Sequence, residues 1–218
     1  VMPPLPEVAR LFAAYGAEYI QGLRYGLAYA TKGTNKVNGR AIELTIADDG
    51  TDPTKAVAAG KDLIGKGYKI LAGSVSSGVA LQMAPLAEQN KVLFISGPAA
   101  SDAITGINKY TFRSGRQTYQ DVKTAATFLQ GVGKKVTVFA QDSAFGIGNY
   151  TAVNSIVGTQ GHTVGRLLVP LSAQDFTPFA QQVKQANPDL LFVAWAGTTA
   201  PAMWRALEQQ GAFGVSNK

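Results

Sequence analysis

The chain has 218 residues, of which 46% are hydrophobic and 16% are charged, with 24 glycines and no cysteine. This balance is typical of a compact globular protein and excludes disulfide bonds, thiolate metal sites and cysteine nucleophiles. The formal net charge is +6, but the basic residues are scattered and the densest run is only Lys134-Lys135. Because a nucleic-acid-binding face shows clustered basic residues, we expect no nucleic-acid partner.

Membrane and targeting signals are also weak. No run reaches the ~18 apolar residues of a membrane span. The first residues lack the basic start and apolar core of a signal peptide. We therefore expect either a cytosolic protein or one whose leader has been removed.

Helical stripes alternate with short, apolar, β-branched runs, and the two periods predict the elements. In chain order they are helix 13–30, strand 41–47, helix 54–67, strand 68–73, helix 78–90, strand 92–96, strand 110–114, helix 119–129, strand 135–140, helix 148–159, strand 163–169, helix 176–186, strand 190–194 and helix 200–210.

This order predicts an α/β protein, because strands alternating with helices form right-handed βαβ units around a doubly wound parallel sheet. Residues 114–117 lie between two such series and have no regular pattern. We interpret them as a crossing between two lobes, residues 1–116 and residues 117–218. A single continuous sheet of about seven strands is the alternative.

Ligands of parallel α/β sheets bind outside the carboxyl ends of the strands, where helix N-termini present free amides. Ser76 and Ser77 follow the second strand in a Ser-rich turn suited to a carboxylate. Ala99, Ala100 and Ser101 follow the third strand with small side chains that leave room for a ligand. Helix capping is the alternative role, by Ser76 or Ser77 in one loop and by Ser101 or Asp102 in the other.

Aromatic residues follow two later strands. Phe145 comes after strand 135–140, and Trp195 with Ala196 comes after strand 190–194. Such side chains suit an apolar lid over a small ligand. Packing in the core is the alternative, because large aromatic side chains dominate core burial.

Enzyme and metal signatures are sparse. The single histidine, His162, follows Gly161, which favours a surface turn, and there is no G-x-S-x-G, H-E-x-x-H, Walker A or G-x-G-x-x-G motif. Asp48, Asp49 and Asp52 suit a hard cation, although a solvated turn with a cap by Asp52 is the alternative. We expect no catalytic residue, no metal site and no cofactor.

Five stretches taken together resemble the type I periplasmic binding proteins, in particular the branched-chain amino-acid (Leu/Ile/Val) receptors of ABC importers. They are VNGRAIEL at 37–44, ADDGTDP at 47–53, GSVSSGVA at 73–80, FRS at 112–114 and DSAFG at 142–146. The match runs in order from about Tyr15 to Gly211.

The resemblance implies two doubly wound lobes that close on a ligand by a hinge. It implies that Ser77 and Ser101 bind a ligand carboxylate and that the Ala99 carbonyl accepts from an ammonium. The walls of the pocket would be Tyr15, Phe145 and Trp195 or Ala196. It further implies a periplasmic or extracellular protein, membrane-associated through an ABC transporter permease, that delivers a small-molecule ligand such as an amino acid without turnover. A ligand-sensing regulator or receptor domain of the same fold is the alternative.

Two departures from the family pattern affect these expectations. Family members open with a strand, whereas residues 1–6 form a poor one, and members continue past Gly211, so the chain is expected to be truncated. Members that bind amino acids often carry an acid near the crossing, where this chain has Gln117. Without an acid a buried ammonium is poorly compensated, which favours aromatic acids, amides or other small carboxylates. Sheet edges exposed by missing strands favour self-association.

Overall fold

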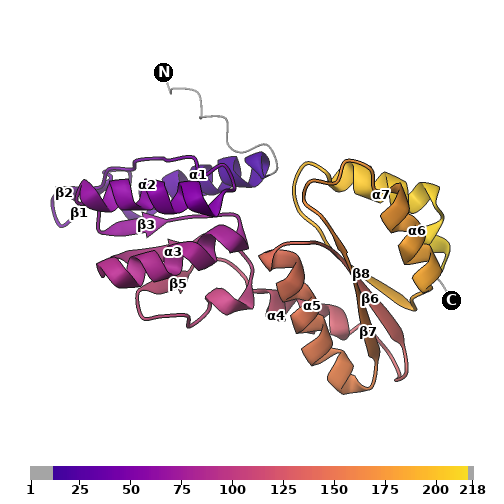
Figure 1. Cartoon of the computed structure of the whole chain (residues 1–218). Coiled ribbons are helices and arrows are strands. Elements are labelled where there is room, and N and C mark those ends of the chain that lie inside the picture. The colour runs from indigo at the N-terminus through magenta and orange to yellow at the C-terminus, as the bar shows by residue number, and fades with distance from the viewer. Residues whose placement is uncertain (1–11, 216–218) are drawn as a thin grey trace.

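The computed structural model describes residues 12–215, whose elements form two groups (Figure 1). Lobe 1 holds the elements from α1 to β5, and lobe 2 holds those from α4 to η3. The helices are α1 (Ala13–Ala30), α2 (Pro53–Gly65), α3 (Ser77–Asn90), α4 (Thr118–Ala126), α5 (Ala144–Ile156), α6 (Thr177–Ala186) and α7 (Ala200–Gln209), with 3₁₀ turns η1 (Asp102–Ile104), η2 (Gly158–Gln160) and η3 (Ala212–Val215). The strands are β1 (Lys36–Val37), β2 (Arg40–Ala41), β3 (Ile70–Ala72), β4 (Leu93–Ser96), β5 (Thr111–Arg113), β6 (Lys135–Gln141), β7 (Thr163–Val169) and β8 (Leu190–Ala194).

Two separate parallel sheets form, one in each lobe. Lobe 1 has the order β3-β4-β5 and lobe 2 the order β7-β6-β8, while β1 and β2 make a small antiparallel hairpin. Within residues 12–215 no strand joins the two sheets, so the single continuous sheet is wrong. The parallel α/β class is confirmed. The exact division after residue 116 stays our proposal, and the separate sheets support it.

Lobe 2 has a three-layer core because β6 carries apolar residues on both faces. Val136 and Val138 are fully buried against α4 and α5. Phe139 points the other way and is fully buried against α6 and α7. Such a continuous apolar run is typical of a parallel strand covered by helices on both sides.

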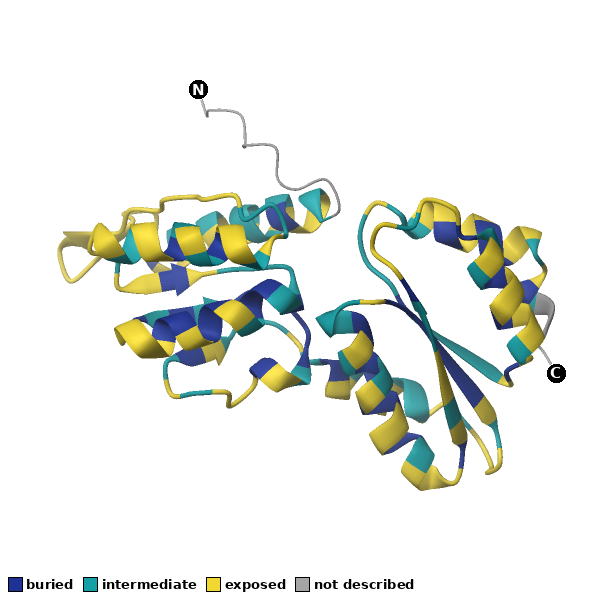
Figure 2. Cartoon of the chain, in the orientation of Figure 1, coloured by how far each residue is buried: buried dark blue, intermediate teal, exposed yellow. Residues whose placement is uncertain are grey.

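Lobe 1 is covered mainly on one face. Leu71 and Phe94 are buried under α3, which packs against α2. Gly60 permits that contact, since a Cβ atom there would lie 2.8 Å from Leu86 Cδ2. On the opposite face Ile70 and Phe112 are 60% and 59% exposed, and Figure 2 colours part of β3 as exposed.

The predicted strand at 41–47 is wrong beyond its first residue. Residues 42–47 have no regular structure and are all exposed, although their apolar and polar residues alternate. Alternation describes an extended backbone, but a strand also needs a hydrogen-bonded neighbour. Among residues 12–215 no strand pairs with this segment.

Smaller corrections concern α5, α4 and the histidine. Helix α5 begins at Ala144 rather than residue 148, because the Ser143 hydroxyl accepts the Gly146 amide and caps it. Helix α4 ends at Ala126 rather than residue 129. His162 is buried at 7% exposure, contrary to the surface turn expected, and its Nδ1 accepts the Lys134 amide at 3.2 Å.

None of the helices within residues 12–215 combines the length and apolarity that a membrane crossing requires. The poor strand expected at residues 1–6 lies outside the described residues.

Candidate functional site

The two serines at the start of α3 have different roles. Ser76 caps the helix, since its hydroxyl accepts the Val79 amide at 3.5 Å, which confirms the capping alternative for this residue. Ser77 is only 3% exposed, and its hydroxyl accepts the Ser101 amide at 3.2 Å. Residues 24 apart in sequence therefore meet at the carboxyl ends of β3 and β4.

The segment that follows β4, residues 98–101, is called the ligand loop below. Ala99, Ala100 and Ser101 are all nearly fully buried in it. The carbonyl of Ala99 accepts from the Arg113 guanidinium at 2.7 Å. The carbonyl of Ala100 accepts from the Thr118 amide and hydroxyl, at 2.9 and 3.0 Å. Donors from β5 and from the start of α4 thus hold the loop through its own backbone carbonyls.

Capping by the side chain of Ser101 is wrong, since η1 has no such hydrogen bond. Asp102 serves a different helix from the one predicted: its Oδ1 accepts the Tyr119 amide at 2.9 Å in the first turn of α4. A lobe 1 carboxylate therefore satisfies a free amide at a lobe 2 helix N-terminus, a place where negative charge is favourable.

Helix α5 brings lobe 2 against the ligand loop. A Cβ atom at Gly148 would lie 3.5 Å from the Ser101 hydroxyl, so the helix backbone passes close to that serine. The structure consequently brings Ser77 and the ligand loop together with the first turns of α5. It places all of them where α3 meets α5, between the two lobes (Figure 1).

The predicted lid residues lie in lobe 2. Phe145, in the first turn of α5, is partly buried against the core of α4, α5 and β6. Trp195 stacks on Phe139 at a centroid distance of 5.4 Å and meets Phe176 edge-on at 5.4 Å. Its indole nitrogen donates to the Thr199 hydroxyl at 3.0 Å. Trp195 therefore packs against the core of lobe 2, which is the alternative role given above for an aromatic at a strand end.

Ala196 is held by a residue that the sequence reasoning missed. The Gln141 side chain accepts the Ala196 amide and donates to its carbonyl, both at 3.0 Å. Gln141 is 3% exposed at the end of β6. The sequence does carry a signal for this contact: Gln141 is a polar residue at the end of a buried, apolar strand. A buried side-chain amide needs hydrogen-bond partners.

Tyr15 lies in the first turn of α1. It is 42% exposed on α1 and its ring packs edge-on to Phe12 at 6.4 Å. The aromatic of α1 that reaches the strand ends is Tyr19, one turn later: a Cβ atom at Gly97 would lie 2.9 Å from its ring. Burial raises the pKa of the Tyr19 phenol, and a hydrogen bond with the Gly73 backbone partly offsets the rise.

The acidic residues near α2 act as turn acceptors. Asp48 accepts the Gly50 amide at 2.9 Å and Asp49 accepts the Thr51 amide at 2.7 Å. Asp52 caps α2 by accepting two amides of its first turn, so the turn-and-cap alternative is confirmed.

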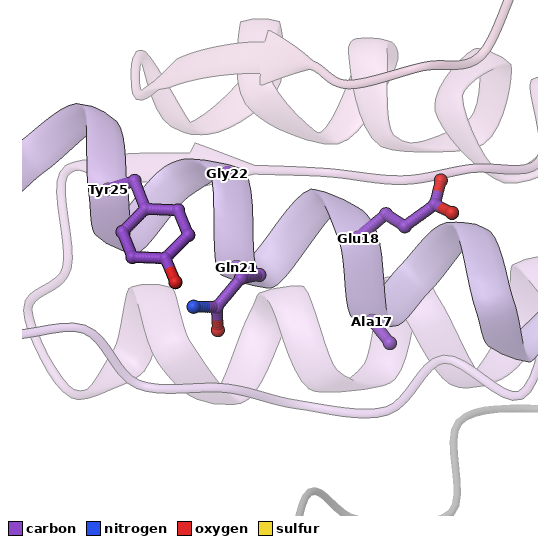
Figure 3. Close-up of a pocket in the computed structure, with 5 residues that line it drawn as sticks. All are labelled: Ala17, Glu18, Gln21, Gly22 and Tyr25. Atoms are coloured by element: carbon purple, nitrogen blue, oxygen red, sulfur yellow. The ribbon is translucent and has the colours of Figure 1, made fainter.

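A hollow of about 570 Å³ lies elsewhere, along α1 (Figure 3). Its lining residues all come from that one helix and include none of the predicted site residues: Ala17, Glu18, Gln21, Gly22 and Tyr25. A binding site draws polar groups from several segments, so we assign no ligand to this hollow.

Comparison with known proteins points to one family. A family model described as periplasmic binding protein matches residues 11–216. Leu/Ile/Val-binding protein homolog 3 of Brucella melitensis is 25% identical over 203 residues, which are 91% of this chain and 55% of the relative. Leu/Ile/Val-binding protein BraC3 of Rhizobium johnstonii is 25% identical over 185 residues, which are 83% and 50%. The chain spans about half the length of the curated relatives it matches.

Solved structures agree with this relationship. An ABC-type branched-chain amino acid transporter from Rhodopseudomonas palustris is 33% identical with a TM-score of 0.67, over 93% of this chain and 57% of that protein. A solute-binding protein of an ABC transporter from the same species, solved in complex with 4-hydroxybenzoate, is 26% identical with a TM-score of 0.77, over 93% and 56%. Because the family model spans all of the described residues and the fold recurs in these structures, the chain belongs to the periplasmic binding protein family.

Proposed function

We propose that this chain contributes to the ligand-binding cleft of an extracytoplasmic solute-binding protein that delivers a small carboxylate to an ABC importer. The single observation that carries this proposal is the meeting of Ser77 and Ser101 between the lobes, at the N-terminus of α3. Hydroxyls beside a helix N-terminus suit a carboxylate, since free amides and the helix dipole favour negative charge. Family membership adds that related chains are binding proteins.

A branched-chain amino acid is the first candidate ligand, because several relatives are Leu/Ile/Val-binding proteins. An aromatic acid is the second, and a specific residue favours it. Gln117 is neutral and its side chain is already used, accepting from the Thr105 hydroxyl at 2.8 Å. Gln117 therefore offers no negative charge to the ammonium of an amino acid. An aromatic acid such as the 4-hydroxybenzoate bound by one structural relative has no ammonium, so it needs no such charge.

A thermal-shift screen tests the proposal, because a ligand that binds only the folded state raises the melting temperature. The compounds are the branched-chain amino acids, 4-hydroxybenzoate and neutral amides of matched shape. A carboxylate that binds is expected to raise the melting temperature of the wild-type chain, and the corresponding amide is expected to leave it unchanged. Ser77→Ala should abolish the shift, while the control Ser155→Ala, on α5, should keep it. Equal shifts for acid and amide would contradict carboxylate recognition.

Turnover separates binding from catalysis. We propose that the chain is not an enzyme, so a ligand incubated with it should be recovered unchanged by mass spectrometry. A product formed in proportion to protein and time would contradict this. A sensor of the same fold would also bind without turnover, and we prefer transport because the named relatives are transport proteins.

We place the protein outside the cytoplasm, associated with the membrane through its permease. Support comes from family membership and from a chain without cysteine, which tolerates an oxidising compartment. Protease accessibility in spheroplasts expressing the full gene product tests this location. Protection of the protein in intact spheroplasts would contradict it.

We also propose that a second copy pairs with the extended segment at residues 42–47. Ile42, Leu44 and Ile46 lie on one side of this segment and are 39%, 42% and 36% exposed. Backbone that no strand within residues 12–215 pairs with, and that carries apolar side chains, is a template for strand pairing. Sedimentation velocity should show a dimer that grows with concentration and that Leu44→Lys weakens. A monomer at every concentration would contradict the proposal.

A further inference from the structure

Arg113, the last residue of β5, has a side chain whose donors are shared among several segments. It is partly buried, and within residues 12–215 none of its five acceptors is a carboxylate. Burial lowers the pKa of the guanidinium and the nearby Asp102 partly offsets this. The five acceptors are Gly115 O at 3.2 Å, Ser101 O at 3.1 Å, Thr105 Oγ1 at 2.9 Å, Ala99 O at 2.7 Å and Arg116 O at 2.5 Å.

Four of the five acceptors belong to two structural units, and the fifth, Thr105, directly follows η1. Ala99 and Ser101 are in the ligand loop, whereas Gly115 and Arg116 are in the crossing segment, residues 114–117, that leads from β5 into α4. One rigid guanidinium therefore ties the loop of the proposed site to the chain between the lobes. A planar fork of five donors can satisfy several fixed acceptors at once.

The two units are also in direct contact. A Cβ atom at Gly115 would lie 3.0 Å from the Gly97 carbonyl, so the crossing segment passes against the base of the ligand loop. The Thr118 amide and hydroxyl then bind the Ala100 carbonyl at the start of α4. A rotation of lobe 2 about the crossing must move the ligand loop or break these bonds.

We propose that Arg113 is a positioning residue that couples the hinge between the lobes to the ligand loop. This inference rests on the proposed function, since it assumes that the loop contacts a ligand. Lysine cannot replace the guanidinium, because a single ammonium has three donors and no planar fork. Loss of the fork frees the loop and the hinge to move separately.

The inter-lobe distance tests the coupling without any ligand. The chain has no cysteine, so Lys61→Cys on α2 and Gln182→Cys on α6 allow spin labelling of two exposed positions. Pulsed electron paramagnetic resonance should give a narrow distribution of the distance between the two labels in the parent. In Arg113→Lys the distribution should be at least about twice as broad, because few contacts restrain the relative motion of two domains. Arg116→Lys is the matched control, since the Arg116 side chain makes an exposed ion pair with Asp121 at 2.8 Å.

Thr105→Val provides a second variant. It removes the Thr105 acceptor of Arg113 together with the hydrogen bond that the same hydroxyl donates to Gln117 in the crossing segment, and it should broaden the distribution to an intermediate extent. It carries the test if Arg113→Lys fails to fold. Unchanged distributions in the arginine and threonine variants, or equal broadening in the Arg116→Lys control, would overturn the coupling.

Binding then separates the two proposals. With leucine and 4-hydroxybenzoate as probes, Arg113→Lys should raise the Kd of whichever probe binds the parent by about tenfold, the effect of roughly 1.4 kcal/mol. If neither probe nor any other carboxylate binds the parent, the proposed function fails while the distance result still decides the coupling. An unchanged Kd together with a broadened distribution would overturn the positioning role.

Discussion

Tyr19 shows how a single side chain can make stability depend on pH. Its ring lies against Gly97, where an added Cβ would approach within 2.9 Å, and burial raises the pKa of its phenol. The folded state thus holds the phenol proton more tightly than the unfolded state, whose tyrosine pKa is about 10. The stability that this group contributes is present below pH ~10 and is lost as pH rises through the raised folded-state pKa.

Tyr19→Phe should remove that loss. Urea unfolding at pH 8 and near pH 10.5 is expected to show a smaller drop in the free energy of unfolding for the variant than for the parent. Tyr29→Phe is the control, because Tyr29 is 90% exposed. The same drop in parent and Tyr19→Phe would mean that the phenol is not the source of the alkaline sensitivity.

At the scale of elements, glycine marks where helices approach strands closely. The start of α5 sits directly on the end of β6, so a Cβ atom at Gly146 would lie 1.8 Å from the Gln141 carbonyl oxygen. A backbone atom cannot move aside as a side chain can. Gly22, in the middle of α1, has nothing within 4 Å of its added Cβ. The two glycines therefore have opposite roles.

Alanine substitution should separate them. Gly146→Ala is expected to destabilise the protein by about 1–3 kcal/mol or more through overpacking. Gly22→Ala should stabilise it by roughly 0.5–1 kcal/mol through helix propensity. Chemical denaturation measures both, with near-ultraviolet circular dichroism reporting tertiary structure. Destabilisation by Gly22→Ala would contradict the open space around Gly22.

At the scale of the whole molecule, the two lobes differ in how completely helices cover their sheets. The lobe 2 sheet has helices against both faces, whereas lobe 1 leaves Ile70 and Phe112 exposed on one face of its sheet. Within residues 12–215 the lobes meet where α3 contacts α5 and where the ligand loop and Asp102 bond to the start of α4 beside the crossing. Limited contact gives limited cooperativity between domains.

Calorimetry should therefore depart from two-state unfolding. The van't Hoff enthalpy is expected to be clearly below the calorimetric enthalpy, and amides of β3 should exchange faster than those of β6. A bound ligand that contacts both lobes should bring the two enthalpies together. Equal enthalpies in the ligand-free chain would contradict independent lobes.

The sequence by itself determined the parallel α/β class, the bounds of α1, β7 and β8, and the cap role of Asp52, because periodicity and capping are local properties. Its motifs also carried the family resemblance that the family model confirms. Two of the nine proposed site residues, Ser77 and Ser101, are brought into hydrogen-bond contact by the fold.

Only the tertiary structure decided which extended segments pair, which polar groups are buried and how the lobes are tied. Residues 42–47 alternate like a strand but have no paired strand among the described residues, and the buried His162 accepts the amide of Lys134, 28 residues earlier in the chain. Three of the five acceptors of Arg113, on Ala99, Ser101 and Thr105, lie 14, 12 and 8 residues before it and reach it only in the folded chain. Pairing, burial and side-chain networks depend on contacts between distant segments, which local pattern does not contain.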